Sequence, residues 1–319
     1  MRAFQVRDFT TKPDIYDIPE PVPAPGEARV TIQACGLNFA DLLMMKGRYQ
    51  DTPKPPFTLG LEMAGTVESL GKDTTGPAPG ARVAIYSGSG GLAEKGCFPV
   101  DRLVPIPDEM SFEHAAAFQI AYGTSHVALK HRARMQPGET LLVLGAAGGV
   151  GLTAVEIGKL MGATVIACAR GADKLEVARQ AGADHLIDAK TQDIRAEVKA
   201  LGGADVVYDP VGGDQWEAAF RACKPEARLI PIGFASGEVP QIPANHMLVK
   251  NLTVLGLYWG GYLKFAPAVL TESMTELFQW YAEGKLRPHV SHVLPLDRAA
   301  EGLELLKSRK STGKVVITP

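Results

Sequence analysis

The sequence predicts an α/β protein with two domains, one a doubly wound parallel sheet of six strands and the other mostly β. Three observations support this prediction. The chain has 319 residues, of which 46% are hydrophobic, and this length suggests two domains. From about residue 140, short β-rich runs alternate with helical stretches, which is typical of βαβ units. Residues 1 to about 120 instead contain short β runs that prolines and glycines interrupt.

The α/β domain is predicted to span residues 121–261. Its six expected strands are 140–145, 163–169, 184–188, 204–209, 227–233 and 251–260. A helical pattern follows the first strand and continues through Lys159. The next three strands are followed by helical patterns at 173–182, 194–203 and 214–223. Six strands with helices between them predict a nucleotide-binding sheet.

The mostly β domain is predicted to span residues 1–120 and to be completed by residues 262–319. Its patterns are two strands, two amphipathic helices and a final strand, at 27–36, 64–71, 270–286, 296–308 and 314–319. Because the two parts of this domain flank the α/β domain in sequence, we expect it to be discontinuous.

The charge of the chain excludes several classes of partner. A net charge of −2 gives no overall positive field to attract nucleic acid or an anionic membrane surface. The N-terminus carries no secretory signal pattern, and no apolar stretch approaches the roughly 18 residues that span a bilayer. We therefore expect a cytoplasmic protein whose partner is a small molecule.

The cysteines and histidines do not predict a metal site. The four cysteines are far apart and form no C-x-x-C pair. His289 and His292 are the closest histidines, but no third ligand lies near them in sequence, and a zinc site needs three or four convergent ligands. We predict no bound metal.

The stretch "LLVLGAAGGVG", residues 141–151, predicts a phosphate-binding turn. Its first glycine position in the pattern G-x-G-x-x-G holds Ala146, but Gly148 and Gly151 remain. Gly148 would let main-chain N–H groups approach a pyrophosphate, and Gly151 would let the next helix lie close to the strand. The N-terminus of that helix attracts anions to the same place. The alternative interpretation is a tight strand-to-helix connection without a ligand.

The end of the second strand indicates which nicotinamide cofactor is preferred. NAD-binding proteins have an acidic residue about 20 residues after the glycine turn, where it binds a ribose hydroxyl. Here this stretch contains Arg170, with Lys174 four residues later. Because arginine pairs with phosphate, we predict NADPH rather than NADH. The alternative is that both cations are solvated, and the nearby Asp173 weakens the prediction.

Several segments in order along the chain resemble the zinc-free quinone oxidoreductase branch of the medium-chain dehydrogenase/reductase superfamily. They are "GLNFADLLMMKGRY", "AAGGVGLTAVEIGKLMGATVIACA", "DVVYDPVGGDQWEAAFRA" and "LIPIGFASGEVPQIPANHMLVKNLTVLGLYWG". The resemblance implies a GroES-like catalytic domain beside a Rossmann NADPH-binding domain.

Departures from the zinc-dependent members point to metal-free chemistry. Leu37-Asn38 stands where those enzymes place a zinc-binding cysteine, and Gly60-Leu61-Glu62 lacks the histidine of their G-H-E motif. The segment 86–98 replaces their four-cysteine lobe. Without a Lewis acid, we expect direct reduction of an acceptor that is already electrophilic, such as a quinone or a conjugated enone.

The resemblance also implies catalytic residues. Asn38 would bind the nicotinamide or the substrate, Asp41 would steady its loop, and Tyr49 would orient an acceptor oxygen or relay a proton. Leu43 occupies a position where some members have a second tyrosine, so a mechanism with two tyrosines is not expected. The alternatives are that Asn38 caps a turn and that Tyr49 is a half-buried aromatic residue.

In the nucleotide-binding domain, the resemblance implies contacts at the carboxyl ends of the strands, where ligands of such sheets collect. For Phe234, Tyr258 and Trp259, simple core packing is the alternative. The implied cofactor-binding residues are Asn38, Thr124, Gly148, Gly149, Val150, Gly151, Arg170, Lys174, Asp188 (near the adenine), Val211, Phe234, Ala235, Ser236, Leu257, Tyr258 and Trp259.

Three functions follow from the sequence. The first is an NADPH-dependent quinone oxidoreductase, and the second is an NADPH-dependent reductase of activated carbon–carbon double bonds, including enoyl thioesters. The third is a nucleotide- or RNA-binding protein without turnover, although no basic patch with interleaved aromatic residues supports RNA. An apolar sixth strand at a sheet edge also predicts a homodimer that pairs this strand with its own copy.

Overall fold

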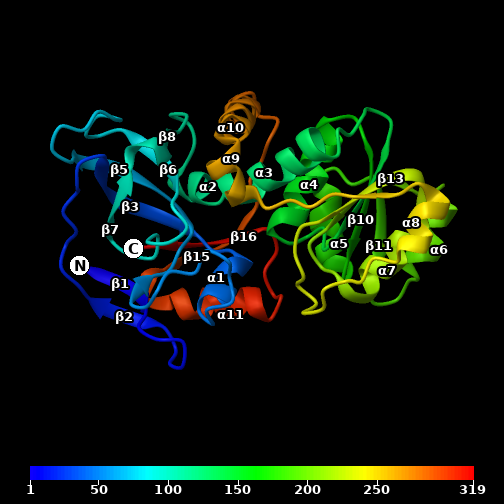
Figure 1. The fold of residues 1–319 in the computed structure, drawn as a ribbon, viewed down its shortest axis with the longest axis horizontal. Helices are drawn as coiled ribbons and strands as arrows, with labels where there is room; N and C mark the ends of the chain where they lie inside the picture. Colours follow the sequence, from blue (N-terminus) through cyan, green and yellow to red (C-terminus); the bar gives the residue numbers. More distant parts are fainter. The chain divides into compact units, whose positions relative to one another are not determined.

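The computed structural model describes residues 1–319, and the chain divides into two compact units. Unit 1 comprises residues 1–120 and 288–319, and unit 2 comprises residues 121–287 (Figure 1). No helix is long and apolar enough to cross a membrane.

Residues 262–287 belong to unit 2, whereas the sequence analysis assigned them to the mostly β domain. Most of this segment forms α10 (Pro267–Ala282), which packs on α3 (Gln119–His126). His126 Nδ1 lies 2.8 Å from Ser273 Oγ, and the His126 ring contacts Trp280 edge-on with centroids 5.3 Å apart. These contacts join the segment to unit 2, and amphipathicity alone could not identify which surface it covers.

Unit 2 contains the predicted six-stranded parallel sheet, in the order β11-β10-β9-β12-β13-β14. Its strands are β9 (Thr140–Leu144), β10 (Thr164–Ala169), β11 (His185–Asp188), β12 (Ala204–Asp209), β13 (Cys223–Pro231) and β14 (Thr253–Val254). The order reverses between β9 and β12, so the first crossovers from these neighbouring strands lead in opposite directions. Such a point is where open α/β sheets bind ligands.

The sixth strand is much shorter than predicted. Only Thr253 and Val254 form ladder pairs, with Arg228 and Leu229 of β13. The Leu255 N–H still donates to the Leu229 carbonyl at 2.8 Å, and a 3₁₀ turn, η3 (Trp259–Gly261), follows soon afterwards. The predicted strand 251–260 is therefore wrong beyond its first residues, because an apolar run does not by itself make strand pairs: the chain leaves the sheet after Leu255 and turns at Trp259.

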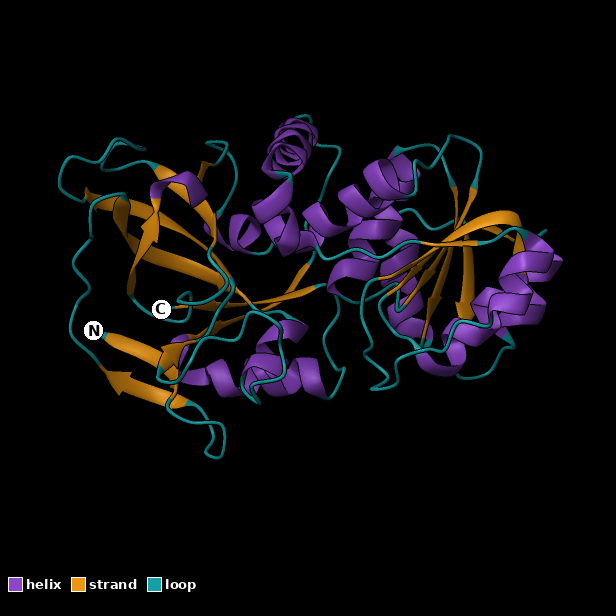
Figure 2. Ribbon diagram, viewed as in Figure 1, coloured by secondary structure: helices purple, strands orange, loops and turns teal.

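Helices flank the unit 2 sheet (Figure 2). The helices of unit 2 besides α3 and α10 are α4 (Gly149–Leu160), α5 (Ala172–Gln180), α6 (Ile194–Ala200), α7 (Gly213–Ala222), α8 (Ala244–Lys250) and α9 (Tyr262–Phe265), and α3 continues into the π-helical turn η2 (Val127–Arg132). Fully buried Leu142, Leu144 and Val207 of the strands pack with Trp216 and Phe220 of α7. This apolar layer fixes the strand ends from which the candidate ligand-binding loops emerge.

Unit 1 is mostly β, in agreement with the sequence prediction. A three-stranded sheet has the order β2-β1-β4, and a larger sheet has the order β15-β16-β3-β5-β6-β8 with β7 also paired to β3. The strands are β1 (Arg2–Val6), β2 (Asp14–Asp17), β3 (Glu27–Gly36), β4 (Phe57–Thr58), β5 (Glu62–Leu70), β6 (Arg82–Tyr86), β7 (Lys95–Pro99), β8 (Leu103–Pro105), β15 (Val290–Pro295) and β16 (Lys314–Thr318). The helices and 3₁₀ turns are α1 (Phe39–Met44), α2 (Phe112–Ala116), α11 (Ala299–Lys307), η1 (Val100–Arg102) and η4 (Leu296–Arg298).

The C-terminal strand β16 pairs antiparallel with the end of β3, with Val316 opposite Gly36 and Ile317 opposite Cys35. On its other edge, β16 pairs in parallel with β15. This arrangement brings Lys314, at the start of β16, to the segment that follows β3. Residues almost 300 positions apart thereby contribute to one site.

Candidate functional site

A buried polar cluster lies at the point where β3 leads into α1. Asn38 precedes α1, and its backbone N–H donates to Asp41 Oδ2 at 2.8 Å. Asp41 Oδ1 accepts a second hydrogen bond from the Gly60 N–H at 3.1 Å. Asp41 is fully buried, so its carboxylate ties the start of α1 to the segment before β5. These two hydrogen bonds are the contacts through which Asp41 would steady the loop, and that role stays a prediction.

Glu62 and Lys314 complete this cluster. The Lys314 ammonium donates to the Leu37 carbonyl at 2.9 Å, to Asn38 Oδ1 at 2.8 Å and to Glu62 Oε1 at 2.7 Å. The other Glu62 oxygen, Oε2, accepts from the Ile120 N–H at 2.9 Å. Both side chains are almost completely buried, and an ammonium has three donors, so every donor of Lys314 has an acceptor.

Gly36 makes this close packing possible. A Cβ at Gly36 would lie 2.2 Å from the Ala116 carbonyl oxygen of α2 and 3.2 Å from Glu62 Oε1. Any side chain here would push α2 and the Glu62 carboxylate away from the end of β3. The glycine that ends β3 is therefore required by the cluster beside it.

Burial alters the acidity of two groups in this region. Desolvation raises the pKa of Asp41 to about 7, against the opposing effect of its two backbone hydrogen bonds. Desolvation, with the nearby Asp41 and Glu62 carboxylates, raises the pKa of the Cys35 thiol well above its usual value. Cys35 is therefore a packing residue rather than a nucleophile.

Tyr49 lies in the turn that follows α1 and is partly exposed. Thr52 closes this turn: its hydroxyl accepts from the Tyr49 N–H at 3.1 Å and donates to the Tyr49 carbonyl at 2.6 Å. The backbone of Tyr49 is thus fixed just after the helix that begins beside Asn38. Leu43 lies within α1 itself.

In unit 2, the glycine-rich turn joins β9 to α4. Gly145 has a φ of +57°, and the Gly148 N–H donates to its carbonyl at 2.9 Å. A Cβ at Gly151 would lie only 2.2 Å from that same carbonyl oxygen, so α4 can approach the end of β9 only with glycine at this position. A Cβ at exposed Gly148 would meet only the Gly145 carbonyl oxygen within 4 Å, at 3.3 Å. The first-turn amides of α4, at Gly149, Val150 and Gly151, have no acceptor within the helix.

A network of buried hydroxyl groups from α3, α4 and β12 lies beside the first turn of α4. Ser125 Oγ of α3 lies 2.8 Å from Thr153 Oγ1 of α4 and 2.9 Å from Tyr208 Oη of β12. The Ser125 and Thr153 hydroxyl oxygens both also lie 3.0 Å from the Val150 carbonyl oxygen. The network fixes the first turn of α4 against its neighbours, and it lies next to the predicted ligand residue Thr124, which is itself buried.

Four predicted cofactor residues come together in the loops after β12 and β13. The Ala235 N–H donates to the Pro210 carbonyl at 3.1 Å, and the Ser236 N–H donates to the Val211 carbonyl at 2.8 Å. A Cβ at Gly145 would lie 2.9 Å from the Val211 side chain, so these loops also reach the glycine-rich turn. Phe234, in the same loop, remains 38% exposed, which is compatible with ligand contact.

Asp209 shapes the start of this loop region. Its fully buried carboxylate accepts hydrogen bonds from the Val211 N–H at 2.7 Å and the Gly212 N–H at 3.0 Å. Desolvation raises the pKa of Asp209 to about 6 in spite of these bonds.

The predicted residues after β14 differ in environment. Trp259 is buried, and a Cβ at Gly123 of α3 would lie 2.7 Å from its indole nitrogen, so Trp259 packs tightly on the helix that carries Thr124. Leu257 and Tyr258 are partly exposed. For Trp259, the geometry supports the packing alternative named for it in the sequence analysis.

Both positively and negatively charged side chains lie near the carboxyl ends of the neighbouring strands β10 and β11. Arg170 is exposed directly after β10, and Lys174 is partly exposed on α5. The Asp188 carboxylate at the end of β11 accepts from the Gly171 N–H at 3.0 Å and from the Lys190 N–H at 2.9 Å, and these bonds lower its pKa. Asp188 therefore joins the two strand ends through backbone hydrogen bonds.

Three charged residues of these sites were missed by the sequence analysis: Lys190, Lys314 and Glu62, the last of which was named only for the histidine absent beside it. A Cβ at Gly171 would lie 3.8 Å from Lys190 Nζ, so the Lys190 ammonium reaches the end of β10 beside Arg170. Lys190 lies 20 positions from Arg170, and Lys314 lies 276 positions from Asn38. No short-range pattern could have identified either residue, although a lysine at the start of an otherwise apolar C-terminal strand was a signal for Lys314.

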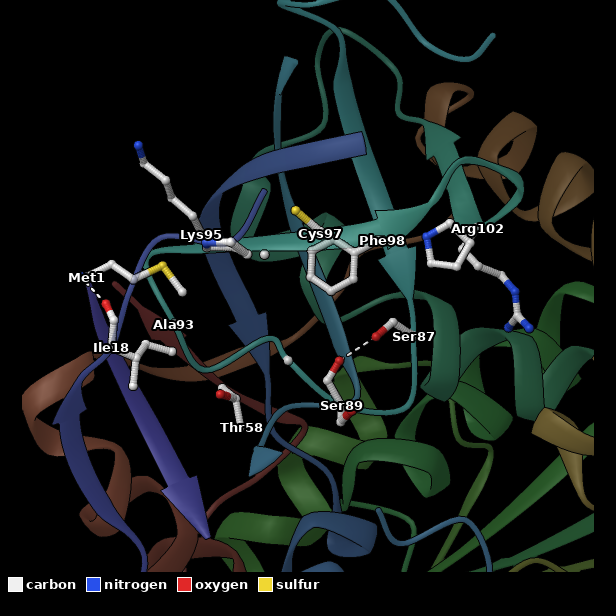
Figure 3. Close-up of a pocket in the computed structure, with 14 residues that line it drawn as sticks. Met1, Ile18, Thr58, Ser87, Ser89, Ala93, Lys95, Cys97, Phe98 and Arg102 are labelled. Atoms are coloured by element: carbon white, nitrogen blue, oxygen red, sulfur yellow. Dashed lines mark hydrogen bonds between the residues drawn. The ribbon is translucent and has the colours of Figure 1, made fainter. Parts of the chain in front are cut away.

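One surface hollow of unit 1, of about 380 Å³, contains none of the predicted residues. The segment 86–98 contributes much of its lining, including Ser87, Ser89, Cys97 and Phe98 (Figure 3). This segment was expected to replace the four-cysteine lobe of zinc enzymes. No group of three or more His, Cys, Asp or Glu side chains could hold a metal ion.

Comparison with known proteins agrees with this architecture. Residues 24–108 match the alcohol dehydrogenase GroES-like domain, and residues 149–281 match the family of zinc-binding dehydrogenases. The quinone oxidoreductase-like protein 2 homolog of Nematostella vectensis is 42% identical over 297 residues, covering 91% of this chain and 81% of that protein.

Solved structures extend the likeness to the whole chain. The quinone oxidoreductase of Thermus thermophilus, known also in complex with NADPH, is 34% identical with a TM-score of 0.89 and full coverage of both chains. The Escherichia coli quinone oxidoreductase in complex with NADPH is 29% identical, with a TM-score of 0.91 and full coverage of both chains. The fold is that of a medium-chain oxidoreductase with a Rossmann and a GroES-like domain. The chain belongs to the zinc-free, quinone oxidoreductase-like branch of the medium-chain dehydrogenase/reductase superfamily.

Proposed function

We propose that this oxidoreductase uses NADPH to reduce quinones without a metal. The observation that carries the proposal is the turn at Gly148–Gly151, which lies where the strand order of the sheet reverses and where a Cβ at Gly151 has no room. Relatives of known structure that bind NADPH share this fold over their whole length. The bound nucleotide would supply the hydride, or an equivalent pair of single electrons, to the acceptor.

The residues of unit 2 fit a dinucleotide phosphate. The first-turn amides of α4, at Gly149, Val150 and Gly151, would bind the pyrophosphate, with the helix dipole favouring its charge. Arg170, Lys174 and Lys190 would bind the 2′-phosphate, since together they outweigh Asp188, whose carboxylate is engaged by backbone N–H groups. The loops at Val211 and Phe234–Ser236 would contact the nicotinamide half.

In unit 1, Asn38 and Tyr49 would act at the nicotinamide and at the acceptor oxygen, and Asp41 would hold the loop between them. Tyr49 would orient the acceptor or pass a proton to it through water. A quinone is electrophilic in its own right, so its reduction needs no Lewis acid to polarise the carbonyl.

Steady-state oxidation of NADPH tests the proposal. We expect turnover with a panel of quinones to exceed turnover with enones and enoyl thioesters, and the KM for NADPH to be lower than that for NADH. Faster turnover of the double-bond substrates would instead assign the enone reductase. A chain that binds NADPH by calorimetry but oxidises none would support the binding protein, and a chain that binds neither nucleotide would contradict the proposal as a whole.

We further propose that the protein is a cytoplasmic homodimer, with units 1 and 2 as its two domains. The two-residue strand β14 is at the edge of the unit 2 sheet, and the adjacent helix α8 exposes Leu248 and Val249 by 78% and 73%. The four free cysteines are compatible with a reducing compartment. Light scattering at micromolar concentration should give the mass of a dimer, and a monomer mass would contradict this assignment.

A further inference from the structure

The side chain of Asn38 has almost no free hydrogen-bonding capacity. A carboxamide has two N–H donors and one oxygen with two acceptor positions. Nδ2 of Asn38 donates to Glu62 Oε1 at 3.0 Å and to the Gly36 carbonyl at 3.2 Å. Oδ1 accepts from Lys314 at 2.8 Å. Both donors are therefore occupied, and one acceptor position on Oδ1 remains.

The partners also determine which way the amide faces. Lys314 can only donate and an ionised Glu62 can only accept, so the amide oxygen must face Lys314 and the amide nitrogen must face Glu62. A 180° flip of the amide would place its N–H groups against the ammonium and its oxygen against the carboxylate. Because both charged groups are buried, solvent would not weaken these two repulsions.

We propose that Lys314 and Glu62 are positioning residues that hold Asn38 as a hydrogen-bond acceptor only. The group that binds Asn38 is then a donor, either the carboxamide N–H or a ribose hydroxyl of the nicotinamide nucleotide. It is not the carbonyl oxygen of a quinone, which would need a donor. This inference rests on the proposed function, and it decides between the nicotinamide and the substrate as the partner of Asn38.

The test removes the charges without leaving one of them unpaired. Lys314→Met alone leaves a buried, unpaired Glu62, so the main variant is the double substitution Lys314→Met/Glu62→Gln, in which the amide can flip. Lys224→Met is the matched control, because Lys224 pairs with Asp205 at 2.7 Å in unit 2, apart from the cluster. Lys314→Arg keeps the positive charge and the donors.

Calorimetry and steady-state kinetics provide the first readout. We expect the double variant to bind NADPH about tenfold more weakly than the wild type, a loss typical of one hydrogen bond, with the Lys224→Met control unchanged. Lys314→Arg should restore at least part of the affinity. Equal NADPH affinity in the wild type and in the folded double variant would overturn the inference.

A nucleotide analogue distinguishes the two sources of the donor. In 3-acetylpyridine adenine dinucleotide phosphate, the carboxamide is replaced by an acetyl group, which has no N–H. If Asn38 binds the carboxamide, the analogue should lose affinity for the wild type only; if Asn38 binds a ribose hydroxyl, the double variant should weaken both nucleotides equally. Both results support an acceptor-only Asn38 and assign its partner.

The free protein offers a second readout that does not depend on nucleotide binding. With asparagine-selective ¹⁵N labelling, both side-chain amide protons of Asn38 should exchange slowly with solvent in the wild type and quickly in the double variant. Fast exchange in the wild type would overturn the inference even if the reductase assignment holds. Failure of the wild type to bind nucleotide, with slow exchange retained, would instead remove only the proposed function and the ligand assigned to Asn38.

Discussion

The two units build their candidate sites by opposite means. In unit 1 the site consists of charged side chains removed from water, where Asn38, Glu62 and Lys314 satisfy one another. In unit 2 the central part of the site is a turn from which side chains are missing, at Gly148 and Gly151. The first kind of site is damaged when a charge is removed, and the second is damaged when an atom is added. The two should therefore respond to different substitutions and differently to pH.

The largest expected effect comes from removing one charge of the unit 1 cluster. Lys314→Met should lower the free energy of unfolding by about 3–5 kcal/mol, because Glu62 is left buried without its partner. Chemical denaturation measures this loss. The double variant Lys314→Met/Glu62→Gln should recover most of it. If Lys314→Met is as stable as the wild type, the unit 1 cluster does not depend on its charge pair, and the contrast drawn between the two units is wrong.

The pH dependence of stability should also distinguish the units. The pKa of Asp41 is about 7 in the folded chain and near 3.8 when unfolded, so the folded state binds the extra proton and this contribution to stability is lost as pH rises from about 4 to 7. The loss attributable to Asp41 is roughly 2–4 kcal/mol. Asp209, with a pKa of about 6, contributes a smaller loss over a narrower range.

Substitution by asparagine isolates these two contributions. Relative to the wild type, Asp41→Asn should gain stability steadily between pH 4 and 7, beyond a constant cost for the weakened backbone hydrogen bonds. Asp209→Asn should show a smaller gain that ends near pH 6. Denaturation curves at several pH values measure both, and a difference between Asp41→Asn and the wild type that is independent of pH would contradict the assigned pKa.

In the glycine turn, two single-methyl substitutions should separate folding from binding. Gly151→Ala forces a contact of 2.2 Å with the Gly145 carbonyl and should cost about 1–3 kcal/mol of unfolding free energy. Gly148→Ala meets only the Gly145 carbonyl oxygen, at 3.3 Å, and would extend into the proposed pyrophosphate site, so it should weaken NADPH binding with little change in stability. Gly256→Ala, where a Cβ meets nothing within 4 Å, is the control. Retained NADPH affinity in Gly148→Ala would argue against a pyrophosphate at this turn.

The smallest expected effect concerns the choice of nucleotide. Arg170→Ala and Lys190→Ala should each lower the affinity for NADPH about tenfold and leave that for NADH unchanged, since each removes one charge-assisted contact with the 2′-phosphate. Arg179→Ala is a suitable control because Arg179 pairs with Glu176 on the same helix α5. Equal losses of affinity for NADPH and NADH would mean that these side chains contact a part of the nucleotide other than the 2′-phosphate.

Local patterns predicted most of the fold. The six-stranded sheet followed from alternating strand and helix patterns, and Gly151 followed from the need for close helix-to-strand packing, which agrees with the 2.2 Å approach. The length of β14 could not be predicted, because an apolar run does not say whether its residues pair or only pack. Likewise, residues 262–287 have an apolar helical face whose partner, α3, is distant in sequence.

The candidate site was less accessible to sequence reasoning. Asn38 and Asp41 are close in sequence and belong to one motif, so they could be identified together. Lys314 and Lys190 reach the same places through strand pairing and loop packing, which short-range patterns do not encode. The pairing of β16 with β3 was the missing piece of information for the unit 1 cluster.

That pairing has a consequence for biosynthesis. Residues 121–287 form one continuous compact unit, whereas unit 1 depends on residues 288–319, which a ribosome makes after that unit. The Lys314–Leu37 hydrogen bond joins residues 277 positions apart. Closing so long a loop costs conformational entropy, and it can happen only after the whole of unit 2, which lies between these residues, has been synthesised. A nascent chain could therefore form its glycine-rich turn first, and the Asn38 cluster would be completed only after β16 had left the ribosome.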